Sequence, residues 1–221
     1  MIRITRYGYD NFFALLGLGL AIMVLSFFFI HPIFMPLAVL LGGWLCFFAF
    51  WFFRDPKRII PTEAISSDAA IIAPADGKVV QIITVHEPRL IQGKATRISI
   101  FLSPLDVHVN RVPTNGTIVF SDYKPGKFLV AMDHRASEEN EQTIIGLTNT
   151  KGAIIFKQMT GALARRIVNE LKEGDRVIAG DAFGMMKFGS RMDVIVPEGA
   201  NLLVKEGQRV VGGVTLLCRL V

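Results

Sequence analysis

The sequence predicts an N-terminal α-helical transmembrane hairpin followed by a mainly β domain, and three observations lead to this fold class. No Asp, Glu, Lys or Arg lies between Asp10 and Arg54, and that window holds 11 of the 17 Phe and both Trp of the 221-residue chain. Residues 54–221 carry 22 basic and 18 acidic side chains, an ordinary proportion for a water-soluble domain. They also contain repeated β-branched runs between turn residues. We therefore expect a membrane anchor at residues 1–58 and a β domain at residues 59–221.

The anchor is predicted to contain two membrane-spanning helices. Residues 12–30 and 33–53 are each close to the ~20 apolar residues that cross a bilayer core as a helix. His31-Pro32 divides them, and a proline at this point favours a tight turn over one continuous helix. One span followed by a re-entrant segment is the alternative. A cleavable signal peptide is disfavoured because the apolar region is too long and a second one follows it.

Basic residues flank the hairpin but are missing from its connecting turn. Arg3 and Arg6 precede it, and Arg54, Lys57 and Arg58 follow it. Because Lys and Arg concentrate on the cytoplasmic side of a membrane, both termini and the β domain are expected in the cytoplasm.

Net charge and cysteine content restrict the partners. The sequence pI is about 9.4, yet the β domain has no basic run with interleaved aromatic residues, so nucleic acid is not an expected partner. A preference for anionic lipid headgroups explains the basic balance better. Cys46 lies in the second span and Cys218 near the C-terminus, so no disulfide is expected between them.

The β domain is predicted as an antiparallel barrel or sandwich with one short helix. Turn pairs such as Asp76-Gly77 and Asn115-Gly116 bound its apolar runs. The stretch 161–171 differs, because its apolar residues recur every four positions, which is typical of an amphipathic helix. No dinucleotide-binding glycine motif, P-loop or metal-ligand cluster is present. The predicted strands lie within residues 78–85, 96–102, 116–120, 153–156, 176–180 and 193–196.

Residues 173–190, EGDRVIAGDAFGMMKFGS, indicate a hairpin with its turn at Gly180-Asp181. This stretch resembles the lipoyl/biotinyl carrier fold, and residues 201–217 contain a second copy of the pattern. Residues 73–82 are similar to the first strand of that fold. The resemblance implies a duplicated carrier-like β architecture, a barrel-sandwich hybrid.

Three polar residues are candidates for chemistry: Asp76 in PADG, His108 in LSPLDVHVNR and Ser190 in KFGSR. Each has an ordinary explanation. Asp-Gly and Gly-Ser pairs are common in turns, and His108 could face solvent from an edge strand. Together they supply an acid, a base and a hydroxyl, the elements of an activated serine. A membrane-bound serine hydrolase is one interpretation, although no GxSxG elbow is present.

Five motifs in order resemble the short, membrane-tethered form of phosphatidylserine decarboxylase. The match extends through nearly all of the β domain, and the two-span N-terminus agrees with it. The motifs are PADGKV around Asp76, FLSPLDVHVNRVPTNG (101–116), YKPGKF (123–128), RASEENEQ (135–142) and MMKFGSRMDVIVP (185–197).

The resemblance implies an enzyme that makes its own cofactor. The chain would break between Gly189 and Ser190, giving a beta subunit of residues 1–189 and an alpha subunit of residues 190–221 that stay together as a heterodimer. Residue 190 would become a pyruvoyl group, form a Schiff base with phosphatidylserine and release CO2 and phosphatidylethanolamine. His108 and Asp76 would activate the serine hydroxyl, and no metal is expected.

A pyruvoyl group meets a definite chemical need. Loss of CO2 from an amino acid leaves a carbanion that no ordinary side chain can absorb, whereas a conjugated ketone can. A proton must then reach Cα, and His108 is the candidate donor because imidazole titrates near neutrality.

The sequence departs from the family pattern at one position. Many relatives carry a second histidine three residues after the first, where this chain has Arg111. Either His108 serves both self-cleavage and decarboxylation, or another group such as His134 contributes. Arg111, Arg165 and Arg166 are candidates to bind the lipid phosphate, with His134 as a further candidate for substrate binding.

A carrier module is the rival function. Met185-Met186-Lys187-Phe188 resembles the attachment turn in which a lysine carries biotin or lipoate, so Lys187 would be the modified residue. The carrier has no use for Asp76 or for a Gly-Ser scission step, which favours the decarboxylase. The expected partners are the lipid bilayer and phosphatidylserine, and a homo-oligomer stays an open alternative.

Overall fold

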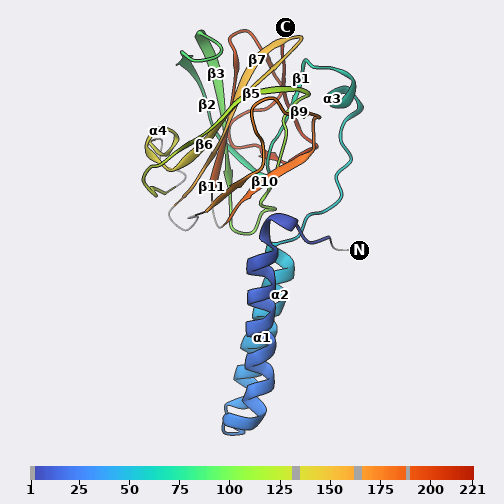
Figure 1. The fold of residues 1–221 in the computed structure, drawn as a ribbon, viewed down its shortest axis with the longest axis vertical. Coiled ribbons are helices and arrows are strands. Elements are labelled where there is room, and N and C mark those ends of the chain that lie inside the picture. Colours follow the sequence, from blue (N-terminus) through green and yellow to red (C-terminus); the bar gives the residue numbers. More distant parts are fainter. Residues whose placement is uncertain (1–2, 131–134, 162–165, 188–189) are drawn as a thin grey trace. The chain divides into compact units, whose positions relative to one another are not determined.

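Two long helices come first in the chain and fourteen strands follow in the computed structural model, which describes residues 3–130, 135–161, 166–187 and 190–221 (Figure 1). The chain divides into two compact units, Met1–Lys57 and Arg58–Val221. The helical segments are η1 (Arg6–Gly8), α1 (Tyr9–Phe29), α2 (Met35–Phe52), α3 (Thr62–Ser66) and α4 (Ala136–Glu139).

In the first unit, α1 and α2 cross at two glycines. A Cβ on Gly42 would lie 2.5 Å from the Gly19 carbonyl oxygen, and one on Gly19 would lie 2.7 Å from the Gly42 oxygen. Small residues at a crossing let two membrane helices approach this closely. The predicted turn is present, because the Phe34 N–H donates to the His31 carbonyl (2.9 Å). Both helices are long and apolar enough to cross a membrane.

The second unit is mainly β, and its strands pair antiparallel. An eight-stranded sheet has the order β13-β2-β3-β11-β7-β6-β5-β9, and two smaller sheets have the orders β1-β14-β12 and β4-β10-β8. The strands are β1 (Ala70–Ile72), β2 (Gly77–Glu87), β3 (Gly93–Leu102), β4 (Val109–Arg111), β5 (Gly116–Lys124), β6 (Gln142–Asn149), β7 (Gly152–Met159), β8 (Ile167–Asn169), β9 (Arg176–Val177), β10 (Ala182–Met186), β11 (Ser190–Pro197), β12 (Asn201–Leu202), β13 (Arg209–Val210) and β14 (Leu216–Arg219).

The main core packs against one face of the large sheet. Alternate residues of β3 and β11 supply it, since successive side chains of a strand point to opposite faces. Phe156 of β7 and Phe183 of β10 meet edge to face in this core, with ring centroids 5.4 Å apart. Each of the six strand runs predicted from the sequence lies in or overlaps a strand. The core members from β3 and β11 are Ile98, Ile100, Leu102, Met192, Val194 and Val196.

The predicted helix at 161–171 is wrong in its described part. Residues 162–165 lie outside the described residues, but Ile167–Asn169 form β8, which pairs with β10. Two adjacent β-branched residues, Ile167 and Val168, favour the extended backbone, and pairing with β10 satisfies the peptide groups. Ile167 and Leu171 still pack against the core, so their spacing reflects burial rather than a helix.

The predicted hairpin at 173–190 is also wrong, although its turn exists. Gly180 has φ of 89°, and the Asp181 N–H donates to the Ile178 carbonyl (3.2 Å). The strands on either side do not pair with each other, because β9 pairs with β5 whereas β10 pairs with β4 and β8. The chain therefore changes sheets at this turn.

Two segments of the β domain repeat the same local geometry. Gly174 and Gly180 have φ of 90° and 89°, and Gly207 and Gly213 have φ of 83° and 77°, six residues apart in each case. β9 follows the first glycine of one pair and joins the start of β5, whereas β13 follows the first glycine of the other and joins the start of β2. This repetition agrees with an internal duplication, and the carrier-like architecture itself stays a prediction.

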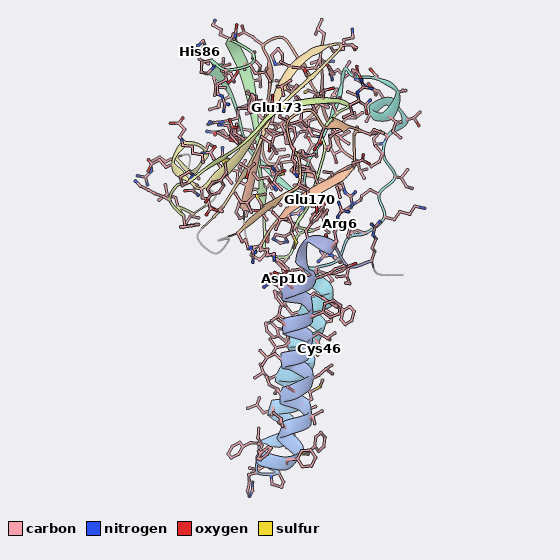
Figure 2. The ribbon with its side chains drawn as sticks, viewed as in Figure 1. Arg6, Asp10, Cys46, His86, Glu170 and Glu173 are labelled. Atoms are coloured by element: carbon pink, nitrogen blue, oxygen red, sulfur yellow. The ribbon has the colours of Figure 1, made fainter. Side chains whose placement is uncertain are left out.

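The glycine crossing of the helix pair gives a first prediction. Replacing Gly42 by Leu should separate α1 from α2, because the new side chain would collide with the α1 backbone. Cys46, labelled on the helix pair in Figure 2, should then react about three- to tenfold faster with an apolar maleimide, as expected for local opening. The other cysteine, Cys218, should stay silent because burial raises the pKa of its thiol to about 12.

Gly43→Leu is the matched control. Apart from the neighbouring residues of α2 itself, no described atom lies within 4 Å of the Cβ position at Gly43, so this variant should label at the wild-type rate. Equal labelling of Cys46 in the Gly42 and Gly43 variants of the full chain in detergent would contradict the proposed close crossing.

Candidate functional site

Ser190 is the first residue of β11, a central strand of the large sheet. It pairs with Leu102 of β3, and the next residue, Arg191, pairs with both Phe101 of β3 and Met159 of β7. Ser190 is fully buried. Its side chain points to the core face, as do Leu102 and Met192, because these positions share the strand alternation. The backbone around residue 190 is therefore fixed by the middle of the sheet rather than by an exposed turn.

His108 immediately precedes β4 and is also fully buried. The alternative that it faces solvent from an edge strand is wrong. The loop before it is shaped by Asp106, whose carboxylate accepts the Ser103 N–H (2.9 Å) and pairs with Arg209. The imidazole thus enters the interior at the end of an ordered loop.

The strand register brings His108 and Ser190 to the same end of the domain. β4 runs antiparallel to β10, with Val109 opposite Met185, so His108 lies beside the last residues of β10. Ser190 follows Met186, the last residue of β10, by four positions along the chain. Gly189, the other half of the predicted scission site, lies outside the described residues.

Asp76 lies at this end of the sheet as well. Lys78 of β2 pairs with Phe101, which in turn pairs with Arg191. The Asp76 carboxylate is held by two groups: the Arg58 guanidinium, at 2.9 and 2.8 Å from its two oxygens, and the Gly212 N–H, at 2.8 Å from Oδ1. Asp76 is therefore engaged in an ion pair and in a turn.

Part of this arrangement recurs at Asn115, the matching position of the internal repeat. PADG at 74–77 corresponds to PTNG at 113–116. The Asn115 Oδ1 accepts the Ala179 N–H (3.0 Å), as the Asp76 Oδ1 accepts the Gly212 N–H. A neutral amide thus accepts the same kind of backbone hydrogen bond at one copy, and the additional feature of Asp76 is a charge that Arg58 balances.

The structure describes two of the four predicted substrate-binding residues. His134 and Arg165 lie outside the described residues. Arg111 is described, and its Nη1 donates to the Gly180 carbonyl (3.0 Å), so part of its guanidinium holds a turn. Arg166 is exposed.

Lys187 is only 5% exposed, and the Met185 and Met186 side chains before it are fully buried. A lysine that carries biotin or lipoate must reach a modifying enzyme and then swing between sites. The burial of Lys187 disfavours that function. Met186 and Phe183 belong to the core, which agrees with a packing function for these apolar residues.

One buried polar cluster behind Ser190 is not predicted by the motifs. Arg191 is fully buried, and its Nε lies 2.9 Å from the Asp193 carboxylate. Its Nη2 donates to the Ser99 hydroxyl (2.6 Å) and to the Gln81 side chain (3.0 Å). The available signal was the R-x-D spacing in SRMDVIVP, which places two charges on one face of a buried strand.

Further charges surround this cluster on the same face. The Nε of Arg97 lies 3.8 Å from the Asp193 carboxylate. Burial lowers the pKa of the Lys157 ammonium below its ordinary value, an effect that the facing Asp193 carboxylate opposes. Within the described residues, no group of three or more His, Cys, Asp or Glu side chains could hold a metal ion.

Comparison with known proteins identifies similar sequences. The profile of the phosphatidylserine decarboxylase family matches residues 45–218. A phosphatidylserine decarboxylase proenzyme of Salinibacter ruber is 51% identical over 186 residues, covering 84% of this chain and 81% of the relative. The proenzyme of Pelodictyon phaeoclathratiforme is 43% identical over 217 residues, covering 97% of this chain and 99% of the relative.

Proposed function

Because this chain belongs to the phosphatidylserine decarboxylase family, we propose that it converts phosphatidylserine to phosphatidylethanolamine and CO2 with a pyruvoyl group made from its own Ser190. The observation that carries this proposal is the state of the Ser190 hydroxyl. It is buried and has no hydrogen-bond partner among the described residues. An unsatisfied buried hydroxyl is costly in a finished structure, but it suits a group that is consumed when the protein matures.

Self-cleavage balances without an oxidant. The Ser190 hydroxyl attacks the Gly189 carbonyl carbon, and an ester replaces the amide bond between the two residues. β-Elimination breaks the Cβ–Oγ bond of residue 190, which leaves a carboxylate on Gly189 and a dehydroalanine at 190. Water then converts the dehydroalanine to a ketone and releases ammonia. The products are residues 1–189 and a fragment of residues 190–221 that begins with the pyruvoyl group.

His108 acts as the base that takes the Ser190 hydroxyl proton, and as the acid that later returns a proton to the substrate Cα. Its burial at the same end of the domain as Ser190 supports both roles. Asp76 is the candidate that orients or supports the imidazole, as carboxylates do at other activated serines. Arg111, His134 and Arg165 stay candidates for binding the lipid phosphate.

The pyruvoyl group supplies a conjugated carbonyl that takes up the substrate amine and accepts the electron pair left by CO2. The residues of the chain bind and orient the lipid and move its protons. Because position 190 is enclosed by the core, water has restricted access to the reacting atoms, which strengthens the electrostatic effect of nearby charges.

The two fragments stay associated through backbone pairing. Residues 190–221 supply β11, which lies between β3 and β7, together with β13 and β14, which pair with β2 and β1. Scission of one peptide bond leaves all of these ladders in place. The mature enzyme is therefore a noncovalent heterodimer, and the finer fold prediction of a duplicated carrier-like domain agrees with the repeated glycine geometry.

The N-terminal helices provide the membrane anchor. Two apolar helices and flanking basic residues favour a hairpin with the β domain on the cytoplasmic side. A diacyl phospholipid stays in the bilayer, so an anchored domain meets its headgroup at high effective concentration.

The first functional prediction concerns Ser190. Ser190→Ala should remain a full-length chain with no decarboxylase activity, because alanine has no oxygen to start the acyl shift. Ser190→Cys should still be cut, since a thiolate is also a nucleophile. Intact mass spectrometry distinguishes an uncut chain from fragments meeting at 189/190. Activity in an uncut Ser190→Ala chain would exclude the mechanism, and a mass gain on Lys187 would favour the carrier.

The second concerns His108. His108→Ala should slow self-cleavage and lower kcat per cleaved chain, each by about 100-fold or more, the usual contribution of a general acid or base. His86→Ala is the control, because His86 is exposed and pairs with Lys94 at the opposite end of β2 (Figure 2). If only cleavage slows, another group, such as His134, donates the proton in decarboxylation.

The third concerns the charge of Asp76. Asp76→Asn retains an oxygen for the Gly212 N–H but removes the negative charge, as Asn115 shows at the equivalent turn. Self-cleavage should slow about tenfold or more. The midpoint of thermal unfolding should fall, because the mostly buried Arg58 loses its carboxylate partner, so cleavage is measured well below that midpoint. Cleavage at the wild-type rate would mean that Asp76 is a turn residue and takes no part in the reaction.

A further inference from the structure

Arg191 is the residue that best defines the position of its neighbour at 190. Ser190 pairs only with β3, whereas Arg191 is the first residue of β11 that pairs with strands on both sides. Its side chain also joins three strands, because Ser99 belongs to β3, Gln81 to β2 and Asp193 to β11. Both the backbone and the side chain of Arg191 are thus held by neighbouring strands.

The cluster is poorly explained as a stability element. Arg191 and Asp193 are both fully buried, and an ion pair of this kind is often no more stabilising than apolar residues of similar volume. The Nη1 of Arg191 also has no hydrogen-bond partner among the described residues. A network that is costly and incompletely satisfied points to a role in specifying position.

We propose that Arg191 is a positioning residue that fixes residue 190 after the chain has been cut, an inference that rests on the proposed function. Before scission, the chain constrains residue 190 from both sides. After scission, residue 190 keeps its pairing with Leu102 on one side and is otherwise tethered through Arg191. The reactive carbonyl must then hold its place relative to the substrate amine, and small displacements of reacting groups are expensive in rate.

The geometry limits Arg191 to an indirect effect. Strand alternation places the side chains of residues 190 and 191 on opposite faces of the sheet. Ser190 faces the core, whereas Arg191 faces the side that carries Ser99 and Asp193. Arg191 therefore does not touch the reacting atoms, and it acts by restricting the backbone from which they project.

The decisive variant removes Arg191 alone. Arg191→Met leaves the Asp193 carboxylate beside the Arg97 guanidinium and opposite Lys157, so no buried charge is left alone and folding should persist. The full chain is assayed in detergent micelles containing phosphatidylserine. We expect wild-type cleavage by mass, a wild-type carbonyl content by phenylhydrazine titration, and a kcat per carbonyl that falls about 10- to 100-fold with KM nearly unchanged.

Two single variants complete the test. Arg191→Lys keeps a positive charge beside Asp193 but loses the planar guanidinium that reaches Ser99 and Gln81 together. Its kcat should therefore lie between those of the wild type and of Arg191→Met. Arg219→Met is the control, because Arg219 also pairs with a carboxylate, that of Glu63, but belongs to β14 in another sheet. It should change kcat by less than about threefold, since within the described residues neither member of this pair contacts the network around Arg191.

Unchanged kcat in a folded Arg191→Met chain would overturn the proposal. An Arg191→Met chain that folds but stays uncut would overturn it too, because the role would then precede scission. If Arg191→Met does not fold, Arg191→Lys decides, and a wild-type kcat in that variant is the contrary result. Failure of the proposed function looks different: the wild-type chain itself would show no fragments and no titratable carbonyl.

Discussion

The antiparallel pairing of β11 with β3 and β7 is the constraint on which the rest of the β domain depends. This pairing places residue 190 at the end of a strand that is buried on both faces, and the proposed scission breaks the chain immediately before the first residue of that strand. Chemistry can therefore occur at the bond while the ladder remains intact. Because strands of residues 190–221 also join β2 and β1, the core needs no covalent link across that bond.

The internal repeat supplies the second constraint. Matching left-handed glycines and matching side-chain hydrogen bonds at Asp76 and Asn115 build similar turns in two places. Only one copy carries a carboxylate, and that carboxylate meets Arg58. A duplicated fold can provide the same turn twice, and one charged residue can then give one of the two turns a chemical role. Asn115 would meet the structural requirement alone, whereas Asp76 would meet both.

The sequence predicted the features that depend on local pattern. Two apolar spans and the β-branched strands follow from residue type and spacing, whereas the site at Asp76, His108 and Ser190 was predicted from the resemblance of five ordered motifs to a known family. The predicted helix at residues 167–169 was wrong because these residues pair with β10 as a strand, despite their four-residue apolar spacing. The predicted hairpin around Gly180 was wrong because the strand before the turn pairs with β5 rather than with the strand after it. The burial of His108 and the contacts of Arg191 with Ser99 and Gln81 could not be predicted, because they result from long-range pairing, although the R-x-D spacing already placed Arg191 and Asp193 on one face.

A charged cluster in a buried strand also answers a problem that scission creates. A strand end that is freed from its upstream chain can slip along its neighbours, and a shift of two residues preserves the alternation of faces. In an entirely apolar strand such a slip costs little beyond packing. Here it would move Arg191 away from Ser99 and Gln81 and leave N–H groups of a buried guanidinium without acceptors, which is unfavourable. Burying the cluster is costly, but the cluster restricts β11 to one register. That register sets the position of the reactive carbonyl.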